Sequence, residues 1–175
     1  SEDDGGLGMG PVAGMVVMEE LGRGIVLEPF AQTLIAGAVL GGYAGEALKK
    51  AWLPRIAGGE AIVVLAYQER KARYRLDVCE AKAVKAGEGW SLTGAKSLVA
   101  IGDQADAYLV PAQADGRIAL FLVERSASGV EARGYGTQDG SRAAEVVFDK
   151  ADATLVTADG LAALEYAVDV GIAAT

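Results

Sequence analysis

Few residues of this chain can do acid–base or nucleophilic chemistry, because its 175 residues include no histidine and a single cysteine, Cys79. Without histidine the chain alone cannot build a Ser-His-Asp or Cys-His catalytic unit, and most zinc sites are excluded as well. A lone cysteine cannot form an internal disulfide, which is typical of a reducing compartment. We expect Cys79 to be a small buried residue on a strand, and we predict no metal site.

A basic segment is the second feature whose residues could bind a ligand. Four cations stand within six positions: Arg70, Lys71, Arg73 and Arg75. In a protein with a formal net charge of -8, such a cluster is either a solvated loop or a site that holds phosphate groups. The residues themselves leave both interpretations open.

The remaining composition excludes several classes of function. A sequence pI near 4.6 argues against nucleic acid as the main partner, because phosphate binding needs clustered Lys and Arg. The spacing of Gly6, Gly8 and Gly10 does not fit a G-x-G-x-x-G dinucleotide loop. The acidic start 1–4 lacks the basic region of a signal peptide, and the apolar run 33–45 is too short for a bilayer. We therefore predict a cytoplasmic protein without a membrane span.

Three helices are predicted in the first third of the chain from apolar residues at helical spacing. The segment 11–22 should form a mostly buried helix, with apolar residues at 12, 15, 16, 17, 18 and 21. A second helix should run from Pro29 to about Gly41, since proline tolerates the first helical position. A third should cover 44–56 and set three apolar residues toward the core: Leu48, Trp52 and Ile56.

After Gly59 the apolar period changes from 3.6 to 2, which marks a domain boundary. Eight candidate strands follow, separated by Gly, Asp and Ser: 62–68, 78–85, 90–93, 96–101, 107–112, 118–124, 130–134 and 144–148. Short strands at regular spacing are typical of a barrel or sandwich. The predicted fold class is α+β, with helices over 1–59, an antiparallel β-barrel over 60–156 and the start of a helical domain over 157–175.

The helical period returns from Asp159 and gives the last helix one apolar face: Leu161, Leu164, Val168 and Ile172. The sequence stops at Thr175 while this face is still apolar and the helix has no cap. We therefore expect this chain to be a fragment of a longer protein.

The central stretch 87–110 reads GEGWSLTGAKSLVAIGDQADAYLV. It resembles the G-x-G-x-x-L-N-G-x-K-x-x-I-T-x-x-x-x-A-D centre of acyl-CoA dehydrogenases. Other segments resemble motifs of the same family in the same order: EDDGGLGMGP, VVMEELGRG, LKKAWLPRIAGGEAIVVLAYQE, and FLVERSASGVEARGY with AAEVVFDKADA. The pattern Q-E-x-x-x-R-Y, with RGYGTQDGSRAAEV later, resembles the divergent branch that includes pimeloyl-CoA dehydrogenase small subunits.

This resemblance implies an N-terminal helical domain, a middle β-barrel and a C-terminal helical bundle. It implies FAD as the cofactor and conversion of an acyl-CoA thioester to a trans-2-enoyl-CoA, with a carboxylate taking the α-proton and the flavin accepting the β-hydride. The implied partners are the acyl-CoA substrate, an electron-transfer flavoprotein and further subunits in a homo- or hetero-oligomer. The family's catalytic glutamate comes from the C-terminal domain, so no catalytic residue is assigned here, and Glu165 is expected on a solvated helix face.

Flavin contacts carry over by position to two segments of this sequence: Leu65, Tyr67 and Gln68 in one, and Leu98, Val99 and Ala100 in the other. In the first segment Gln68 replaces the threonine of the family's T-E-P-x-x-G-S-D motif, of which only Glu69 is kept. Its amide can still donate or accept a hydrogen bond. Tyr74 stands at the serine position near the substrate's thioester arm.

Three positions depart from the family in ways that weaken a flavin site. Arg73 is bulky where a glycine lets the backbone approach the ligand. Leu98 replaces an aromatic residue that packs on the flavin ring, although the ring of Tyr67 offers a partial substitute. Ala100 replaces the threonine that reaches the flavin N5 atom.

Two alternative functions are open besides that of an enzyme. The chain is alternatively a non-catalytic subunit that keeps the fold and serves as a scaffold for an active large subunit. A third interpretation, an unrelated β-barrel binding module, leaves the flanking helices unexplained.

Overall fold

The computed structural model describes Glu2 and residues 5–175, so the predictions that concern Ser1, Asp3 and Asp4 lie outside the described residues. The helices are α1 (Gly10–Gly24), α2 (Phe30–Tyr43), α3 (Glu46–Ala57) and α4 (Gly160–Ala173). The strands are β1 (Val63–Leu65), β2 (Lys82–Ala86), β3 (Gly89–Ala100), β4 (Ala107–Ala114), β5 (Arg117–Glu124), β6 (Val130–Gly136) and β7 (Arg142–Thr157). Between β1 and β7 the described residues contain strands and turns and no helix, as predicted.

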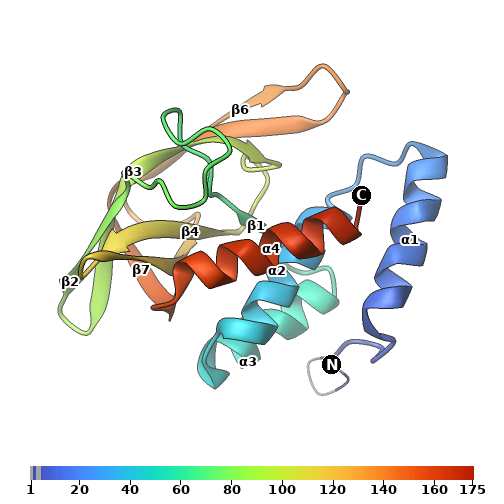
Figure 1. Ribbon diagram of the computed structural model, residues 1–175, viewed down its shortest axis with the longest axis horizontal. Coiled ribbons are helices and arrows are strands. Elements are labelled where there is room, and N and C mark those ends of the chain that lie inside the picture. Colours follow the sequence, from blue (N-terminus) through green and yellow to red (C-terminus); the bar gives the residue numbers. More distant parts are fainter. Residues whose placement is uncertain (1, 3–4) are drawn as a thin grey trace.

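The sheet closes on itself. Strands β4, β2, β3, β7 and β5 are neighbours in that order, and the pairing of β4 with β5 completes a five-stranded barrel (Figure 1). Strand β1 pairs with β4, and β6 pairs with β7 outside this ring. The predicted barrel is confirmed, but it is mixed, because β4 runs parallel to both β1 and β2. Long connections separate the parallel partners in sequence, as parallel pairing requires.

Several predicted strand boundaries were wrong, and one reason is that Gly94 does not interrupt a strand. The candidates 90–93 and 96–101 fall on the single strand β3, which ends at Ala100, and 144–148 lies in the first half of the much longer β7. An added Cβ at Gly94 would lie 2.6 Å from the Cβ of Ala81, so this glycine permits close approach of two backbones. The candidate 62–68 shrinks to β1, and β2 begins only at Lys82, with a loop between them.

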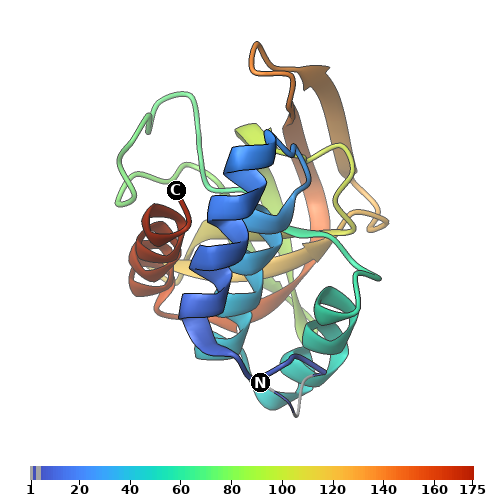
Figure 2. The same cartoon turned by 90° about the vertical axis from the view of Figure 1, so that its right-hand side faces the viewer.

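Two apolar clusters hold the fold together. The first fills the barrel and includes Leu92, Tyr108 and Phe121. The second lies between the helices and the outer face of the barrel, where Val39 and Trp52 meet Leu109. Both views show α2 and α4 packed side by side along that face (Figures 1 and 2). The core-facing residues predicted for α3 are confirmed, because Trp52 is buried with Leu48 and Ile56 packed around it.

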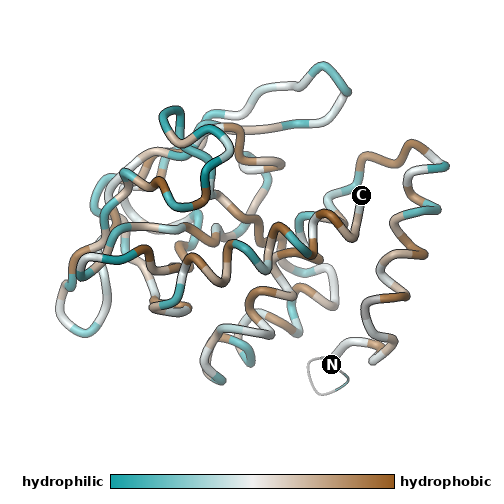
Figure 3. Tube along the Cα trace, in the orientation of Figure 1, coloured by the Kyte–Doolittle hydropathy of each residue, from teal (hydrophilic) through white to brown (hydrophobic). Residues whose placement is uncertain are grey.

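Helix α1 departs from its prediction as a mostly buried helix. Val12, Met15 and Val16 are 68%, 53% and 55% exposed. The helix stands at the margin of the molecule, and Figure 3 shows hydrophobic segments along its tube. Its apolar residues lie on several sides of the helix, whereas among the described elements its main packing partner is α2. Hydrophobic patterning therefore predicted the helix correctly but not its burial.

Helix α4 packs with most of the face that its apolar residues predicted. Leu164 is buried, Leu161 and Val168 are half-buried, and of the predicted face only Ile172 is largely exposed. The buried face also uses small residues, Ala163 and Ala167, which let α4 approach its neighbours closely. No helix among the described residues is long and apolar enough to cross a membrane.

Candidate functional site

A backbone hydrogen bond joins the two segments that contain the six residues carried over from the family. We call them the candidate edge: Leu65, Tyr67, Gln68, Leu98, Val99 and Ala100. The backbone N–H of Ser97 donates a hydrogen bond of 2.9 Å to the carbonyl oxygen of Gln68. This bond places the segment that follows β1 directly beside the end of β3. Two segments that are far apart in the sequence therefore lie side by side.

A β-bulge shapes the β3 side of the candidate edge. The register between β3 and β7 shifts between Lys96 and Val99, and Leu98 has a φ of 52°. Leu98 is turned outward and is 58% exposed, whereas Val99 points into the barrel and is 2% exposed. Only the backbone of Val99 can therefore face a ligand. Non-glycine residues at positive φ are uncommon and gather at functional sites.

The β1 side of the candidate edge is more enclosed. Leu65 is half-buried and packs against the cluster beneath the helices. Tyr67 and Gln68 are half-buried as well. Ala100, at the end of β3, is half-buried and has only a methyl group to offer. The edge therefore presents apolar surface and one side-chain amide, without a hydroxyl at position 100.

The basic segment forms the turn of the loop 66–81. Each of three cations pairs with an acid: Arg70 with Glu145 at 3.6 Å, Lys71 with Glu80 at 2.8 Å, and Arg75 with Asp77 at 2.6 Å. Arg73 adopts a φ of 53°, so it keeps a backbone conformation that favours glycine. Tyr74 is 89% exposed beside it. The solvated-loop interpretation fits the paired cations, while Arg73 and Tyr74 remain available to a ligand.

Beneath this loop lies an ion pair to which the sequence analysis assigned no role. Lys96 Nζ donates to Glu69 Oε1 at 2.7 Å, and the side chains are 0% and 4% exposed. The same carboxylate accepts the backbone N–H groups of Glu80 at 2.6 Å and Ala81 at 3.1 Å. Burial raises the pKa of Glu69, but the bond and charge of Lys96 and the two N–H groups outweigh it, so the pKa is lowered.

Both partners could have been found from the sequence. Glu69 is the one residue kept from its motif, and Lys96 is the lysine of the central G-x-K motif. Two opposite charges in motif positions are a signal for an ion pair, but which carboxylate meets which lysine depends on the tertiary fold.

Cys79 contacts the same ion pair. It lies in the loop before β2, half-buried, so the prediction of a buried strand position was wrong. Its sulfur lies 3.3 Å from the Pro111 carbonyl oxygen and 3.5 Å from Glu69 Oε1. Burial raises the pKa of the thiol to about 11, against the opposing charge of Lys96. A thiol with that pKa is protonated at neutral pH and unreactive.

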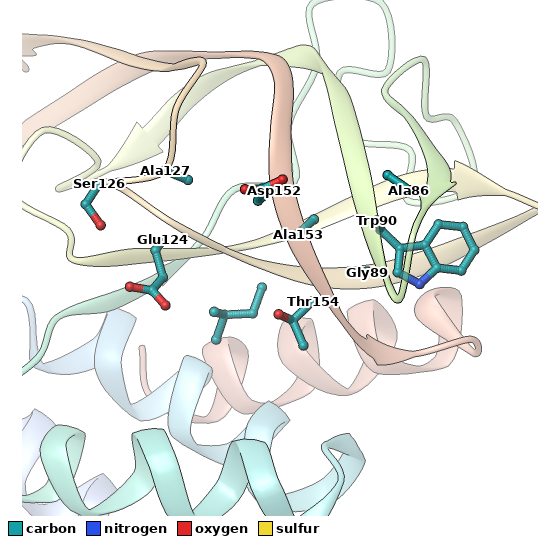
Figure 4. A pocket seen from close by; sticks show the side chains of 10 residues that line it. Ala86, Gly89, Trp90, Glu124, Ser126, Ala127, Asp152, Ala153 and Thr154 are labelled. Atoms are coloured by element: carbon teal, nitrogen blue, oxygen red, sulfur yellow. The ribbon is translucent and has the colours of Figure 1, made fainter.

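A separate hollow of about 490 Å³ lies at the other end of β3. Gly89 and Trp90 line it at the start of the strand, with Glu124 and Asp152 among the other residues (Figure 4). Eleven residue steps of strand separate Gly89 from Ala100, roughly 35 Å at the usual rise. This hollow is therefore not part of the candidate edge.

The comparisons with known proteins agree with this fold. Residues 1–60 match the family model described as acyl-CoA dehydrogenase, N-terminal domain. Acyl-CoA dehydrogenase FadE27 of Mycobacterium tuberculosis is 29% identical over 130 residues, 74% of this chain and 34% of the relative. A solved Tcur3481-Tcur3483 steroid ACAD variant superposes with a TM-score of 0.88 at 29% identity, covering 99% of this chain and 47% of that one. These likenesses in sequence and in fold are all to acyl-CoA dehydrogenases, the family that the motifs of the sequence resemble.

A third similar protein was solved with a flavin bound. The glutaryl-CoA dehydrogenase of Mycobacterium smegmatis, solved in complex with FADH2, is 26% identical, with a TM-score of 0.76. It covers 81% of this chain, and this chain covers 39% of it. The chain thus spans between a third and a half of the length of these acyl-CoA dehydrogenases.

The chemistry of the candidate edge fits one side of a flat aromatic cofactor. Leu98 offers exposed apolar surface on a strained bulge, which suits contact with a ring face. The Gln68 amide can donate or accept a hydrogen bond at the ring margin. Ala100 supplies no side-chain donor, so the fit lacks one polar contact.

Proposed function

We propose that the protein is an FAD-dependent acyl-CoA dehydrogenase that converts an acyl-CoA thioester to a trans-2-enoyl-CoA. The observation that carries this proposal is the candidate edge, because it joins two motif segments of the family through the Ser97–Gln68 hydrogen bond and leaves Leu98 facing outward. When bound, FAD supplies the hydride acceptor for oxidation of the α,β bond.

Within this proposal each residue of the chain has a limited task. Leu98 and Leu65 contact the ring through apolar surface, and Gln68 forms a polar contact at its margin. Tyr74 and Arg73, at the exposed tip of the loop, meet the thioester arm and phosphate groups of the acyl-CoA. No residue of the chain is assigned the proton-abstracting role, and Glu165 is exposed on α4.

The proposal extends to domains and partners. We propose helices over 1–59, a barrel over 60–156 and the first helix of a third domain over 157–175. Electrons pass on to an electron-transfer flavoprotein, and the protein acts as an oligomer with chains of its own family. The cytoplasmic location expected from the sequence stays a prediction.

A second candidate is a non-catalytic scaffold subunit that pairs with an active partner. The conformation of Arg73 favours it, because a bulky side chain occupies a left-handed position where close approach of a ligand calls for glycine. Leu98 and Ala100 weaken the same edge.

The experiment that separates the two is the ultraviolet-visible spectrum of the full-length purified protein, followed by anaerobic addition of acyl-CoA substrates of several chain lengths. An active enzyme shows flavin bands that bleach on addition of a substrate. A protein that neither retains flavin nor binds added FAD is not the proposed enzyme, and the scaffold interpretation then stands. Flavin bands that no acyl-CoA bleaches would leave cofactor binding without the proposed reaction.

A further inference from the structure

The loop 66–81 is attached to β3 at two adjacent points. Gln68 accepts the backbone N–H of Ser97, and the next residue, Glu69, pairs with the preceding one, Lys96. The first contact lies at the candidate edge, and the second lies directly beneath it. The two contacts lie on adjacent residues of both segments, so a loop that leaves Lys96 also moves Gln68 away from the bulge at Leu98.

Burial sets the Glu69–Lys96 pair apart from the other ion pairs of the loop. Removing both charges from water is costly, and their attraction offsets this cost only with good geometry and further hydrogen bonds. Here the Glu69 carboxylate accepts two further hydrogen bonds, from the backbone N–H groups of Glu80 and Ala81. Such a pair contributes little net stability, yet it strongly disfavours arrangements in which the charges separate.

The carboxylate also links three parts of the chain. Glu69 lies in the segment after β1, and Lys96 lies in β3. Glu80 and Ala81 directly precede β2. One buried group thus fixes both ends of the loop against the same strand. Gly94 permits this, since Ala81 occupies the space that a Cβ at position 94 would need.

We propose that the buried Glu69–Lys96 ion pair positions the candidate edge, with Lys96 as the anchor that holds Gln68 beside Leu98 and Ala100. The identification of FAD as the ligand of this edge rests on the proposed function, whereas the placement of the loop does not. Neither residue needs to touch the flavin. Both are positioning residues.

Cys79 provides a direct report on the loop, because it is the chain's only cysteine and its sulfur lies 3.5 Å from Glu69 Oε1. The rate at which a maleimide labels Cys79 in the native full-length protein measures how often the loop leaves β3. Loss of the Lys96 charge alone would raise the pKa of the thiol further and slow labelling. Faster labelling in a Lys96 variant therefore reports opening of the loop.

The experiment uses Lys96→Met, the double variant Glu69→Gln/Lys96→Met, and Lys71→Met as a matched control. Lys71 is on the same loop and pairs with Glu80 at 2.8 Å, but its side chain is 75% exposed. Exposed ion pairs of this kind contribute little to folding stability. For each protein the thermal midpoint, the Cys79 labelling rate and the FAD dissociation constant are measured.

We expect Lys96→Met to lower the thermal midpoint, to speed Cys79 labelling about tenfold and to weaken FAD binding about tenfold, as for loss of one charged hydrogen bond. The double variant should recover much of the midpoint, since it leaves no buried unpaired charge. Its labelling rate and FAD affinity should stay altered, because a neutral Gln–Met contact does not fix the loop. Lys71→Met should match the wild type in all three.

Two results would overturn the proposal. One is a double variant with wild-type labelling and wild-type FAD affinity, which would make the pair purely structural. The other is unchanged Cys79 labelling in a folded Lys96→Met protein. If the wild type binds no FAD, the proposed function fails, and the labelling rates alone decide whether the ion pair positions the loop.

Discussion

Ser97 donates its backbone N–H to the carbonyl oxygen of Gln68 at 2.9 Å, one residue away from the buried contact between Lys96 and Glu69. This pairing joins the two motif segments on which the proposed flavin site depends. At the bulge that follows Ser97, Val99 points into the barrel and Leu98 away from it. The predictions below test this arrangement.

The missing hydroxyl at position 100 gives the first prediction. Ala100→Thr should tighten FAD binding about tenfold, because one neutral hydrogen bond is worth about 0.5–1.5 kcal/mol. Flavin titration of the full-length protein measures the change. Ala95→Thr, on an exposed position of the same strand, is the matched control and should leave the affinity unchanged. Equal affinities of Ala100→Thr and the wild type would remove position 100 from the site.

Position 68 gives the second prediction. Gln68→Ala removes the only side-chain amide of the candidate edge and should weaken FAD binding by about fivefold to tenfold. The backbone bond to Ser97 does not depend on the side chain, so the thermal midpoint should change little. The same titration checks it. An unchanged affinity in a protein that binds FAD would show that the carry-over at this motif is wrong, although family membership would stand.

The sequence predicted the helices and the barrel, because apolar periods and turn residues are local properties. The family was predicted separately, from the resemblance of its motifs. The sequence did not predict how β3 passes through Gly94, since the close approach of Ala81 is a contact between distant residues. It missed the Glu69–Lys96 pair for the same reason. The exposure of Val12 and Met15 shows the converse limit, because an apolar helix face is buried only where another surface covers it.

The lowered pKa of Glu69 gives the third prediction. Burial raises that pKa, but Lys96 and two backbone N–H groups together lower it by more, so the net shift is downward. A depressed carboxyl pKa contributes stability that is present above the unfolded pKa, about 4.3, and is lost as pH falls through the folded value. We therefore measure urea midpoints from pH 7 to about pH 3. Below the unfolded pKa they should fall more steeply for the wild type than for Glu69→Gln. Parallel curves would contradict it.

The left-handed conformation of Arg73 gives the fourth prediction. At a φ of 53°, Arg73→Gly should stabilise the protein by about 1 kcal/mol, because glycine adopts this region without the steric cost of a Cβ. Arg70→Gly, on the same loop and without a positive φ, should destabilise it slightly through added freedom of the unfolded chain. Urea denaturation measures both. A stabilised Arg70→Gly would point to charge removal as the cause.

Close packing at Gly94 gives the fifth prediction. An added Cβ there would lie 2.6 Å from the Ala81 Cβ and 2.8 Å from its Cα, so backbone must shift. Gly94→Ala should therefore destabilise the protein by about 1–3 kcal/mol, as overpacking does, and should speed maleimide labelling of Cys79 by displacing the start of β2. Gly41→Ala is the control, because Gly41 lies in α2 with no atom within 4 Å of an added Cβ. That change should stabilise the helix by about 0.5–1 kcal/mol and leave Cys79 labelling as it is. If Gly94→Ala were as stable as the wild type, the loop 66–81 would not be held against β3 as closely as the structure shows.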